Sequence, residues 1–312
     1  MLLTDSFLEY LKYERNYSDK TVVSYGTDLR EFDAFLREEC QREVSPQEVD
    51  ASLIREWMMS LMEKEVKATS VNRKLSALRS FYKFLLKRGM VTVDPTRKVT
   101  GPKKKKPLPV FLKESEMDRL LDEVDFGDSF EGCRDHTILH MFYETGMRRA
   151  ELIGLDDKDV DFSGKVIRVT GKRNKQRLIP FGDELKEAML AYVDKRNEAL
   201  PVRSEAFFVK KDGKRLYPGK VGQIVSEHLS KVVTAKKKSP HVLRHTFATT
   251  MLNHHAGLGT IKELLGHESL ATTEIYTHTT FEELKQVYNQ AHPRAEEKKG
   301  GYYGIKNSSD SL

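Results

Sequence analysis

Cysteine and long apolar runs are both scarce in this chain of 312 residues. Its two cysteines, Cys40 and Cys133, are too few for a disulfide framework or a zinc cluster, and they suit a reducing compartment. No apolar run is long enough to cross a bilayer, and acidic residues interrupt the apolar N-terminal stretch where a secretory signal would lie. We therefore expect a cytoplasmic protein that makes no membrane contact.

Signatures of common cofactors are missing as well. The sequence has no P-loop and no other glycine-rich nucleotide motif. The best candidate metal pair, His241 and His245, has helical spacing but lacks the third ligand of an HExxH-type site. We therefore expect neither a cofactor nor a bound metal.

Charged residues, by contrast, make up 32% of the chain, and the net charge of +6 is unevenly placed. Residues 1–94 carry 15 basic and 16 acidic residues, and residues 110–312 carry 32 and 31. Residues 95–109, PTRKVTGPKKKKPLP, carry six basic residues and no acid. A basic, proline-punctuated segment between two balanced blocks predicts an interdomain linker. It is either a solvated tether or a strap along a phosphate backbone.

The first 90 residues predict a compact helical domain. Apolar residues recur there every three or four positions, Ser18 can cap a helix, and Ser45-Pro46-x-Glu48 is typical of a helix start. A helix between Thr69 and Gly89 has a polar face that is either solvated or in contact with DNA. That face consists of Asn72, Ser76, Arg79, Lys83 and Lys87.

The remainder predicts a mainly α domain with a small β-sheet insert, so a chain of this length has room for two domains. β-branched, turn-bounded runs predict strands at 160–162, 166–170 and 176–180. Helical periodicity predicts helices at 113–124, 133–146, 183–200, 221–233 and 280–291.

The segment Pro240–His278 gathers residues that could act on a phosphate. His241 and Arg244 lie three residues apart, on one face of an expected helix, and His267 and Tyr276 follow. A guanidinium matches two phosphate oxygens, imidazoles move protons, and a phenol can attack phosphorus. Taken singly, each residue could equally be solvated or packed.

Read together, HVLRHTFAT, LGHES and TTEIYTH resemble the C-terminal signature of the tyrosine recombinases, the phage integrase superfamily. Upstream, TGMRRAEL matches the family's T-G-x-R-x-x-E-L box, in which the arginine is Arg148. The hairpin GKRNKQR resembles the one that carries the family's catalytic lysine, which corresponds to Lys172 here, with Lys175 as the rival. The size and layout of the chain resemble the Xer-type branch.

The resemblance implies six catalytic residues: Arg148, Lys172, His241, Arg244, His267 and Tyr276 as nucleophile. If Tyr276 is not the nucleophile, Tyr288 is the next tyrosine along the chain. Glu151 is expected to brace local structure. The residues expected to contact DNA are Arg79, Lys83, Lys103, Lys104, Lys105 and Lys106.

The implied domains are a helical, SAM-like core-binding domain at 1–90, a basic linker at 91–109, a catalytic domain at 110–292 and a mobile tail at 293–312. The resemblance also implies that the helix at 280–291 docks on a neighbouring subunit.

The implied function is site-specific recombination of double-stranded DNA through a 3′-phosphotyrosyl intermediate and a Holliday junction. The implied assembly is a homotetramer, or a heterotetramer with a related recombinase, and in the Xer-type branch it resolves chromosome dimers, often with a DNA translocase. The alternatives are an integrase or invertase of a mobile element, a type IB topoisomerase, and a catalytically dead DNA-binding protein.

Overall fold

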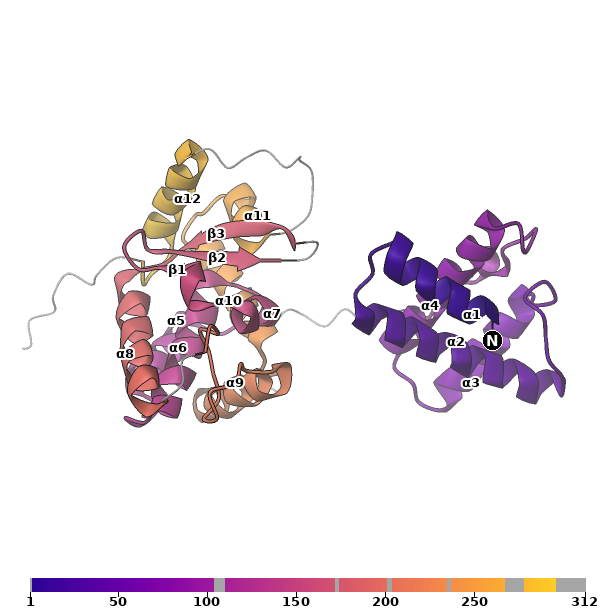
Figure 1. Ribbon diagram of the computed structural model, residues 1–312, viewed down its shortest axis with the longest axis horizontal. Helices are drawn as coiled ribbons and strands as arrows, with labels where there is room; N and C mark the ends of the chain where they lie inside the picture. Colours follow the sequence, from indigo (N-terminus) through magenta and orange to yellow (C-terminus); the bar gives the residue numbers. More distant parts are fainter. Residues whose placement is uncertain are drawn as a thin grey trace, which may run out of the picture. The chain divides into compact units, whose positions relative to one another are not determined.

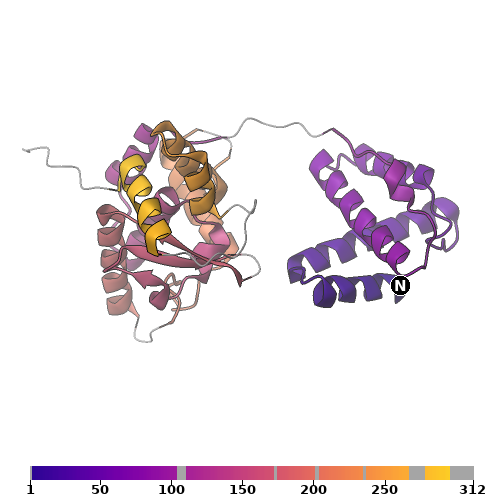
Figure 2. The same cartoon turned by 90° about the horizontal axis from the view of Figure 1, so that it is seen from above.

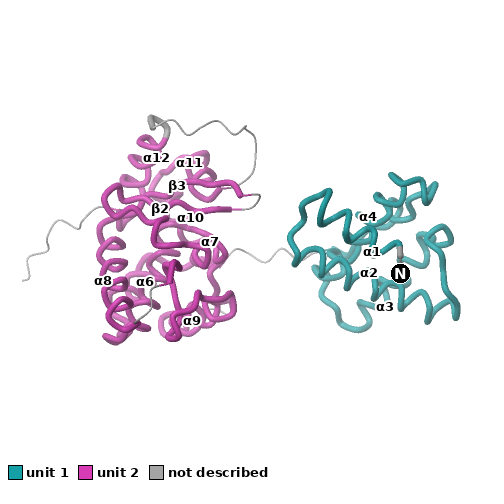
Figure 3. The backbone as a smooth tube through the Cα atoms, viewed as in Figure 1, with its two compact units in different colours: residues 1–107 teal, residues 108–312 magenta. Residues whose placement is uncertain are grey.

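The structure, a computed structural model, describes residues 2–103, 110–171, 174–200, 204–234, 237–266 and 278–295. The chain divides into two compact units, residues 1–107 and 108–312 (Figure 3). None of the helices within the described ranges has the length and apolarity of a membrane-spanning segment.

All the regular elements described in the first unit are helical (Figure 1). Its elements are α1 (Leu2–Glu9), the π-helical turn η1 (Tyr10–Glu14), α2 (Asp19–Cys40), α3 (Ala51–Glu63), α4 (Ala68–Lys87) and the 3₁₀ turn η2 (Pro95–Lys98). These elements enclose an apolar core that includes Phe7, Trp57 and Tyr82, all of which are buried.

Two helix starts in this unit show how far local sequence decides structure. The Ser18 side chain accepts a hydrogen bond from the Thr21 N–H at 3.3 Å and caps α2, as predicted. The predicted start at Ser45 is wrong. Glu48 does accept from the Ser45 N–H at 2.8 Å, but it closes only a turn, and Asp50 caps α3 instead.

The segment after α4 belongs to the first unit. Val91, Thr96 and Val99 are buried in or against its core. The Asn72 side-chain amide donates to the Pro102 carbonyl at 2.9 Å, so the chain is fastened to α4 up to that point. The predicted linker at 91–109 therefore starts too early, because residues 91–102 are folded.

The second unit is mainly α with a small β-sheet, as predicted. Before and within the sheet come α5 (Glu114–Asp118), the π-helical turn η3 (Arg119–Glu123), α6 (Phe130–Thr145), α7 (Arg149–Gly154), the 3₁₀ turn η4 (Asp157–Asp159), β1 (Val160–Asp161), β2 (Val166–Thr170) and β3 (Gln176–Pro180). After it come α8 (Asp183–Ala199), α9 (Pro218–Val232), α10 (Pro240–Asn253), α11 (Leu258–Leu265) and α12 (His278–Ala291).

The sheet is antiparallel in the order β1-β2-β3, with Ile167 opposite Ile179. Helices α11 and α12 contact β3, and α7 contacts β2 (Figures 1 and 2). Helix α6 forms the centre of the unit, where it packs against α8 and α10. The predicted helices and strands are therefore present, with some boundaries shifted.

Helix α12 packs on its own unit. Leu284 and Tyr288 are buried with Phe247 of α10 and Leu264 of α11 in one apolar cluster. The apolar face of α12 is thus covered within the chain. Docking of this helix on a neighbouring subunit stays a prediction.

The chain after α12 also stays folded as far as Ala295. The Arg294 side chain is buried, and it pairs with Asp118 at 3.0 Å and with Glu184 at 2.7 Å. The predicted tail thus begins too early at Pro293, and residues 296–312 lie outside the described part of the chain.

Candidate active site

Arg148 is positioned by the end of one helix and the start of the next. Gly146 ends α6 in the left-handed region, at φ 57°, and a Cβ there would lie 2.4 Å from the Phe247 ring. Arg148 then caps α7, and its N–H donates to Glu151 Oε2 at 2.7 Å. Its Nη1 donates to Glu151 Oε1 at 2.8 Å and its Nη2 to the Gly266 carbonyl at 2.8 Å. A third of the side chain is exposed.

Arg244 reaches the same place from α10. Its Nη1 donates to the Gly146 carbonyl at 2.6 Å and its Nη2 to the Leu265 carbonyl at 2.7 Å. Burial, together with the nearby cations Arg148 and Arg177, lowers the pKa of Arg244 to about 10. The side chain still carries its charge at neutral pH. The two arginines predicted from separate motifs are therefore brought together.

Arg177, on β3, is a third member of this cluster that the sequence analysis missed. Its Nη1 and Nη2 donate to the two carboxylate oxygens of Glu151 at 2.8 and 2.9 Å, and its Nε donates to the Leu264 carbonyl at 2.9 Å. A signal was present, because the strand alternation puts Arg177 on the same buried face as Ile179.

Glu151 joins two of these arginines, in keeping with the bracing role expected for it. Burial alone would raise the pKa of its carboxyl, but hydrogen bonds and charge from Arg177 and Arg148 hold that pKa below its usual value. Glu151 is therefore a carboxylate at neutral pH, and it offsets one of the three positive charges.

His241 lies in the first turn of α10, exposed and one helical turn before Arg244. Lys175 is exposed near the end of the β2–β3 hairpin, where its carbonyl accepts from the Gly171 N–H at 2.7 Å. The predicted site residues Lys172, His267 and Tyr276 lie outside the described residues. The carbonyl of Gly266, the residue before His267, accepts a hydrogen bond from Arg148.

Tyr288 is excluded as the alternative nucleophile. Its side chain is fully buried, and its hydroxyl donates to Glu144 Oε2 at 3.0 Å. Burial and the Glu144 carboxylate raise the pKa of Tyr288 well above its usual value. A phenol held in this way cannot reach a phosphate.

In the first unit, Arg79 and Lys83 are exposed on α4, on the face predicted to meet DNA. Arg79 also donates to the Val99 carbonyl at 2.7 Å, which fastens the returning segment. Lys103 is exposed just after that segment, and Lys104, Lys105 and Lys106 lie outside the described residues.

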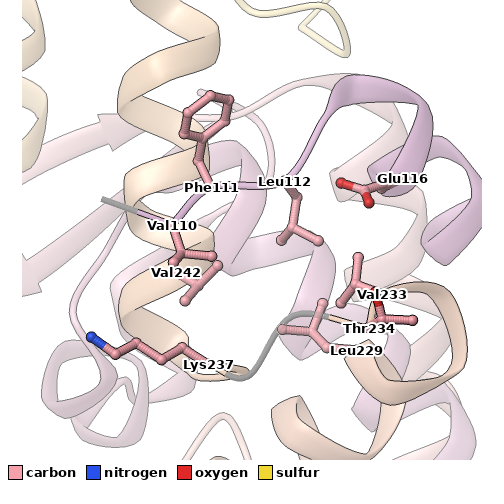
Figure 4. A pocket seen from close by; sticks show the side chains of 9 residues that line it. All are labelled: Val110, Phe111, Leu112, Glu116, Leu229, Val233, Thr234, Lys237 and Val242. Carbon is pink, nitrogen blue, oxygen red and sulfur yellow. The ribbon is translucent and has the colours of Figure 1, made fainter. Parts of the chain in front are cut away.

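Neither a metal cluster nor a nucleotide pocket is part of the arginine cluster. Within the described ranges, no group of three or more His, Cys, Asp and Glu side chains could hold a metal ion. A cavity of about 190 Å³ opens elsewhere in the second unit and shares no lining residue with the cluster (Figure 4). It is lined by Val110, Phe111, Leu112, Glu116, Leu229, Val233, Thr234, Lys237 and Val242.

Comparison with known proteins gives the chain its family. Residues 110–283 match the Phage integrase family, and residues 4–89 match the Phage integrase, N-terminal SAM-like domain. The chain is 38% identical to the tyrosine recombinase XerC of Chlorobaculum tepidum, over 93% of this chain and 94% of that protein. It is also 38% identical to the tyrosine recombinase XerC of Staphylococcus carnosus, over 95% of this chain and 99% of that protein.

Solved structures agree in fold. The XerH recombinase in its post-cleavage complex with difH substrate is 21% identical, with a TM-score of 0.69 over 92% of this chain and 84% of that one. The Tn1549 transposon integrase in complex with transposon right end DNA is 19% identical, with a TM-score of 0.68 over 91% and 98%. From the family matches and the close relatives together, the chain belongs to the phage integrase family, as an Xer-type tyrosine recombinase.

Proposed function

We propose that this protein is a site-specific DNA recombinase that uses a 3′-phosphotyrosyl intermediate and a Holliday junction. The observation that carries the proposal is the convergence of Arg148 and Arg244 beside the C-terminal end of α11. Two guanidiniums held by main-chain carbonyls are preorganised to bind the non-bridging oxygens of one phosphate. Solved structures of similar fold include recombinases bound to their DNA substrates, which supports double-stranded DNA as the ligand.

The proposed reaction balances without an external reactant. The Tyr276 oxygen bonds to the scissile phosphorus, His241 accepts the phenol proton, and the bond from phosphorus to the 5′-oxygen breaks. Lys172 protonates the departing 5′-oxygen, while Arg148, Arg244 and His267 stabilise the charge on the phosphate. The roles of Lys172, His267 and Tyr276 rest on the family resemblance.

Rejoining is the same reaction in reverse, with a 5′-hydroxyl of the partner strand as the nucleophile. The phosphotyrosyl ester conserves the energy of the broken phosphodiester, so we propose that ligation needs no ATP. The arginines supply the positive charge that a divalent cation provides in other phosphoryl-transfer sites, so we propose that no metal is needed.

The proposed biological role is resolution of chromosome dimers at cell division, in the cytoplasm. The high identity to XerC proteins along nearly the whole chain supports it. The partners in this role are a second recombinase or further copies of this chain in a tetramer, and a DNA translocase. An integrase or invertase of a mobile element would use the same chemistry on another site.

Trapping the covalent adduct tests this proposal. The wild-type protein should form a protein–DNA adduct, and sequencing the attached DNA identifies the target site. Tyr276→Phe should still bind that site and form no adduct, because only the phenolic oxygen can bond to phosphorus.

An adduct that persists in Tyr276→Phe would contradict the mechanism. A type IB topoisomerase would instead relax plasmids that lack the recovered site. A DNA-binding protein with an inactive site would give no wild-type adduct at all.

A further inference from the structure

Three arginines converge on three successive carbonyls at the end of α11. Arg177 donates to the Leu264 carbonyl at 2.9 Å, Arg244 to the Leu265 carbonyl at 2.7 Å, and Arg148 to the Gly266 carbonyl at 2.8 Å. The last carbonyls of a helix have no partner within the helix, and they carry the negative end of its dipole. The end of α11 is therefore a binding surface for cations, and two of its cations belong to the proposed active site.

Arg177 differs from the other two in where its donors point. All three of its nitrogens donate inward, two to Glu151 and one to the Leu264 carbonyl, and the side chain is only 8% exposed. Arg148 is a third exposed, and it keeps donor capacity beyond its bonds to Glu151 and Gly266. Arg177 is thus not placed to touch a substrate phosphate.

The two arginines are coupled through one carboxylate. Glu151 accepts from Arg148 and from Arg177 on the same oxygen, Oε1, at 2.8 Å each. Without Arg177, the single negative charge of Glu151 would face Arg148 alone. The Arg148 guanidinium would then be drawn toward Glu151 and partly neutralised.

Resting on the function proposed above, we propose that Arg177 is a positioning residue for phosphate binding. It balances the charge of Glu151 and fixes the end of α11, so that Arg148 keeps its orientation and its positive charge for the scissile phosphate. Gly266 contributes by allowing the close approach: its φ is 63°, and a Cβ there would lie 3.1 Å from Arg177 Nη1.

Lysine cannot replace arginine in this role. It keeps the charge, but it lacks the planar fork that grips both oxygens of Glu151 while a third nitrogen reaches a carbonyl. Arg177→Lys is therefore the main test variant, and Arg177→Met removes the charge as well.

The substrate for the test is the duplex recovered on the wild-type adduct, with either a phosphate or a neutral methylphosphonate at the scissile position. On phosphate, Arg177→Lys should cleave about 10–100-fold more slowly than the wild type, as is usual when an outer partner of a functional group is removed. Binding to the site should be unchanged. On methylphosphonate, the deficit relative to the wild type should largely disappear, because the charge that Arg148 neutralises is absent.

A double-mutant cycle gives a second reading. If Arg177 acts through Arg148, then Arg148→Ala combined with Arg177→Lys should cleave no more slowly than Arg148→Ala alone. A purely structural role would instead multiply the two losses.

Arg196 provides the matched control. It lies on α8, is 6% exposed, and grips Asp157 with two hydrogen bonds of 2.7 and 2.9 Å, away from the cluster. Arg196→Lys should lower thermal stability, and any loss of cleavage should be the same on both substrates.

Several outcomes would overturn the inference. Equal deficits of Arg177→Lys on both substrates, or losses that multiply with Arg148→Ala, would give Arg177 a structural role only. Failure of both Arg177 variants to fold would lead to the same conclusion. If Tyr276→Phe still formed the adduct, the proposed function itself would fail, whatever the Arg177 variants did.

Discussion

Arg244 is one of the two arginines proposed to bind phosphate. Both of its terminal nitrogens donate to carbonyls, and its pKa is lowered to about 10 by burial and by its cationic neighbours. An arginine tolerates such a shift and stays charged at neutral pH. A lysine has a lower ordinary pKa, so the same surroundings would bring its pKa closer to neutral pH and reduce the charged fraction.

We therefore expect Arg244→Lys to behave as a severe loss. The lysine cannot donate two parallel hydrogen bonds to the phosphate oxygens, as a guanidinium can. Loss of a transition-state donor typically lowers the rate about 10²–10³-fold. Single-turnover cleavage of the recovered site measures this directly. Cleavage near the wild-type rate would make Arg244 a residue that only holds α11.

The general acid can be tested with a 5′-bridging sulfur, which departs as a thiolate and needs no proton. Lys172→Ala should cleave ordinary DNA very slowly and sulfur-substituted DNA at close to the wild-type rate. Arg148→Ala should not be rescued, because its partners are the non-bridging oxygens. Rescue of Lys175→Ala in place of Lys172→Ala would move the role to Lys175.

At this scale the sequence predicted two arginines that the fold brings together, but not the residues that hold them. Motif spacing identified Arg148 and Arg244, because each is read within a short stretch of chain. Arg177 was missed because its partners, Glu151 and Leu264, are distant in sequence and only the fold brings them together. The exclusion of Tyr288 likewise needed the buried contact with Glu144.

Among the elements, α12 depends on a buried carboxylate. Glu144 of α6 is fully buried, and it accepts from Tyr288 at 3.0 Å and from the Gly182 N–H at 3.1 Å. Helix α12 is thus held by a polar contact as well as by its apolar face. Deleting residues 280–312 would therefore destabilise the second unit itself, rather than affect only its assembly.

Tyr288→Phe isolates the polar contact. It keeps the ring in place and leaves the buried Glu144 short of one donor, so we expect a loss of about 1–3 kcal/mol in stability. Urea unfolding followed by circular dichroism measures the loss, and the fluorescence of Trp57 serves as an internal reference for the first unit. Tyr217→Phe, at an exposed position, is the control, and a similar effect of both changes would argue against the contact.

We expect His292, just after α12, to make the stability of this region depend on pH. Its ring is buried against Tyr288 and Phe247, near Glu144, His140 and Arg294. Burial lowers the pKa of His292 to about 4. The unfolded state, with a pKa of about 6.5, therefore takes up a proton that the folded state does not, and stability falls as the pH drops from about 6.5 to about 4.

His292→Phe keeps an aromatic ring and removes the titrating group. Its stability should fall less between pH 7 and pH 5 than that of the wild type, measured by urea unfolding at each pH. Below about pH 4.5 stability should still fall in this variant, because the pKa of Glu144 is lowered and the unfolded carboxyl there takes up a proton that the folded one does not. An unchanged slope would assign the acid sensitivity to other groups.

Periodicity predicted the elements more reliably than their ends. The three strands lie where β-branched runs and turns indicated them, because alternation is a local property. The predicted helix start at Ser45 is wrong because Asp50, five residues later, caps α3 with its side chain. Helix α12 was predicted, but its contacts with α10 and α11 were not, because an apolar stripe does not identify what covers it.

For the whole molecule, we expect both units to contact the same DNA. The basic run beginning at Lys103 starts where Asn72 and Arg79 have fastened the chain to the predicted DNA-contacting face of α4. Whether the run is a strap on DNA or a solvated tether stays a prediction. The fastening was not predictable, because residues 91–102 have no strong helical or strand pattern.

Replacing Lys103 to Lys106 with serine tests the strap. Binding should weaken on any DNA sequence, and each lost phosphate contact should flatten the log–log salt dependence by about 0.9. Titrations on a duplex at several salt concentrations give the slope. An unchanged slope would make the run a solvated tether.

Residues 91–102 are folded onto the first unit, and the described part of the second unit begins at residue 110. The segment that connects the two units is therefore short. Once one unit is on DNA, a connection this short holds the other at an effective concentration on the order of millimolar. The joined chain should then bind about 10²–10⁴ times more tightly than either half. If both units bind DNA as proposed, each half should release and rebind its stretch of DNA rapidly while the protein as a whole stays on its site.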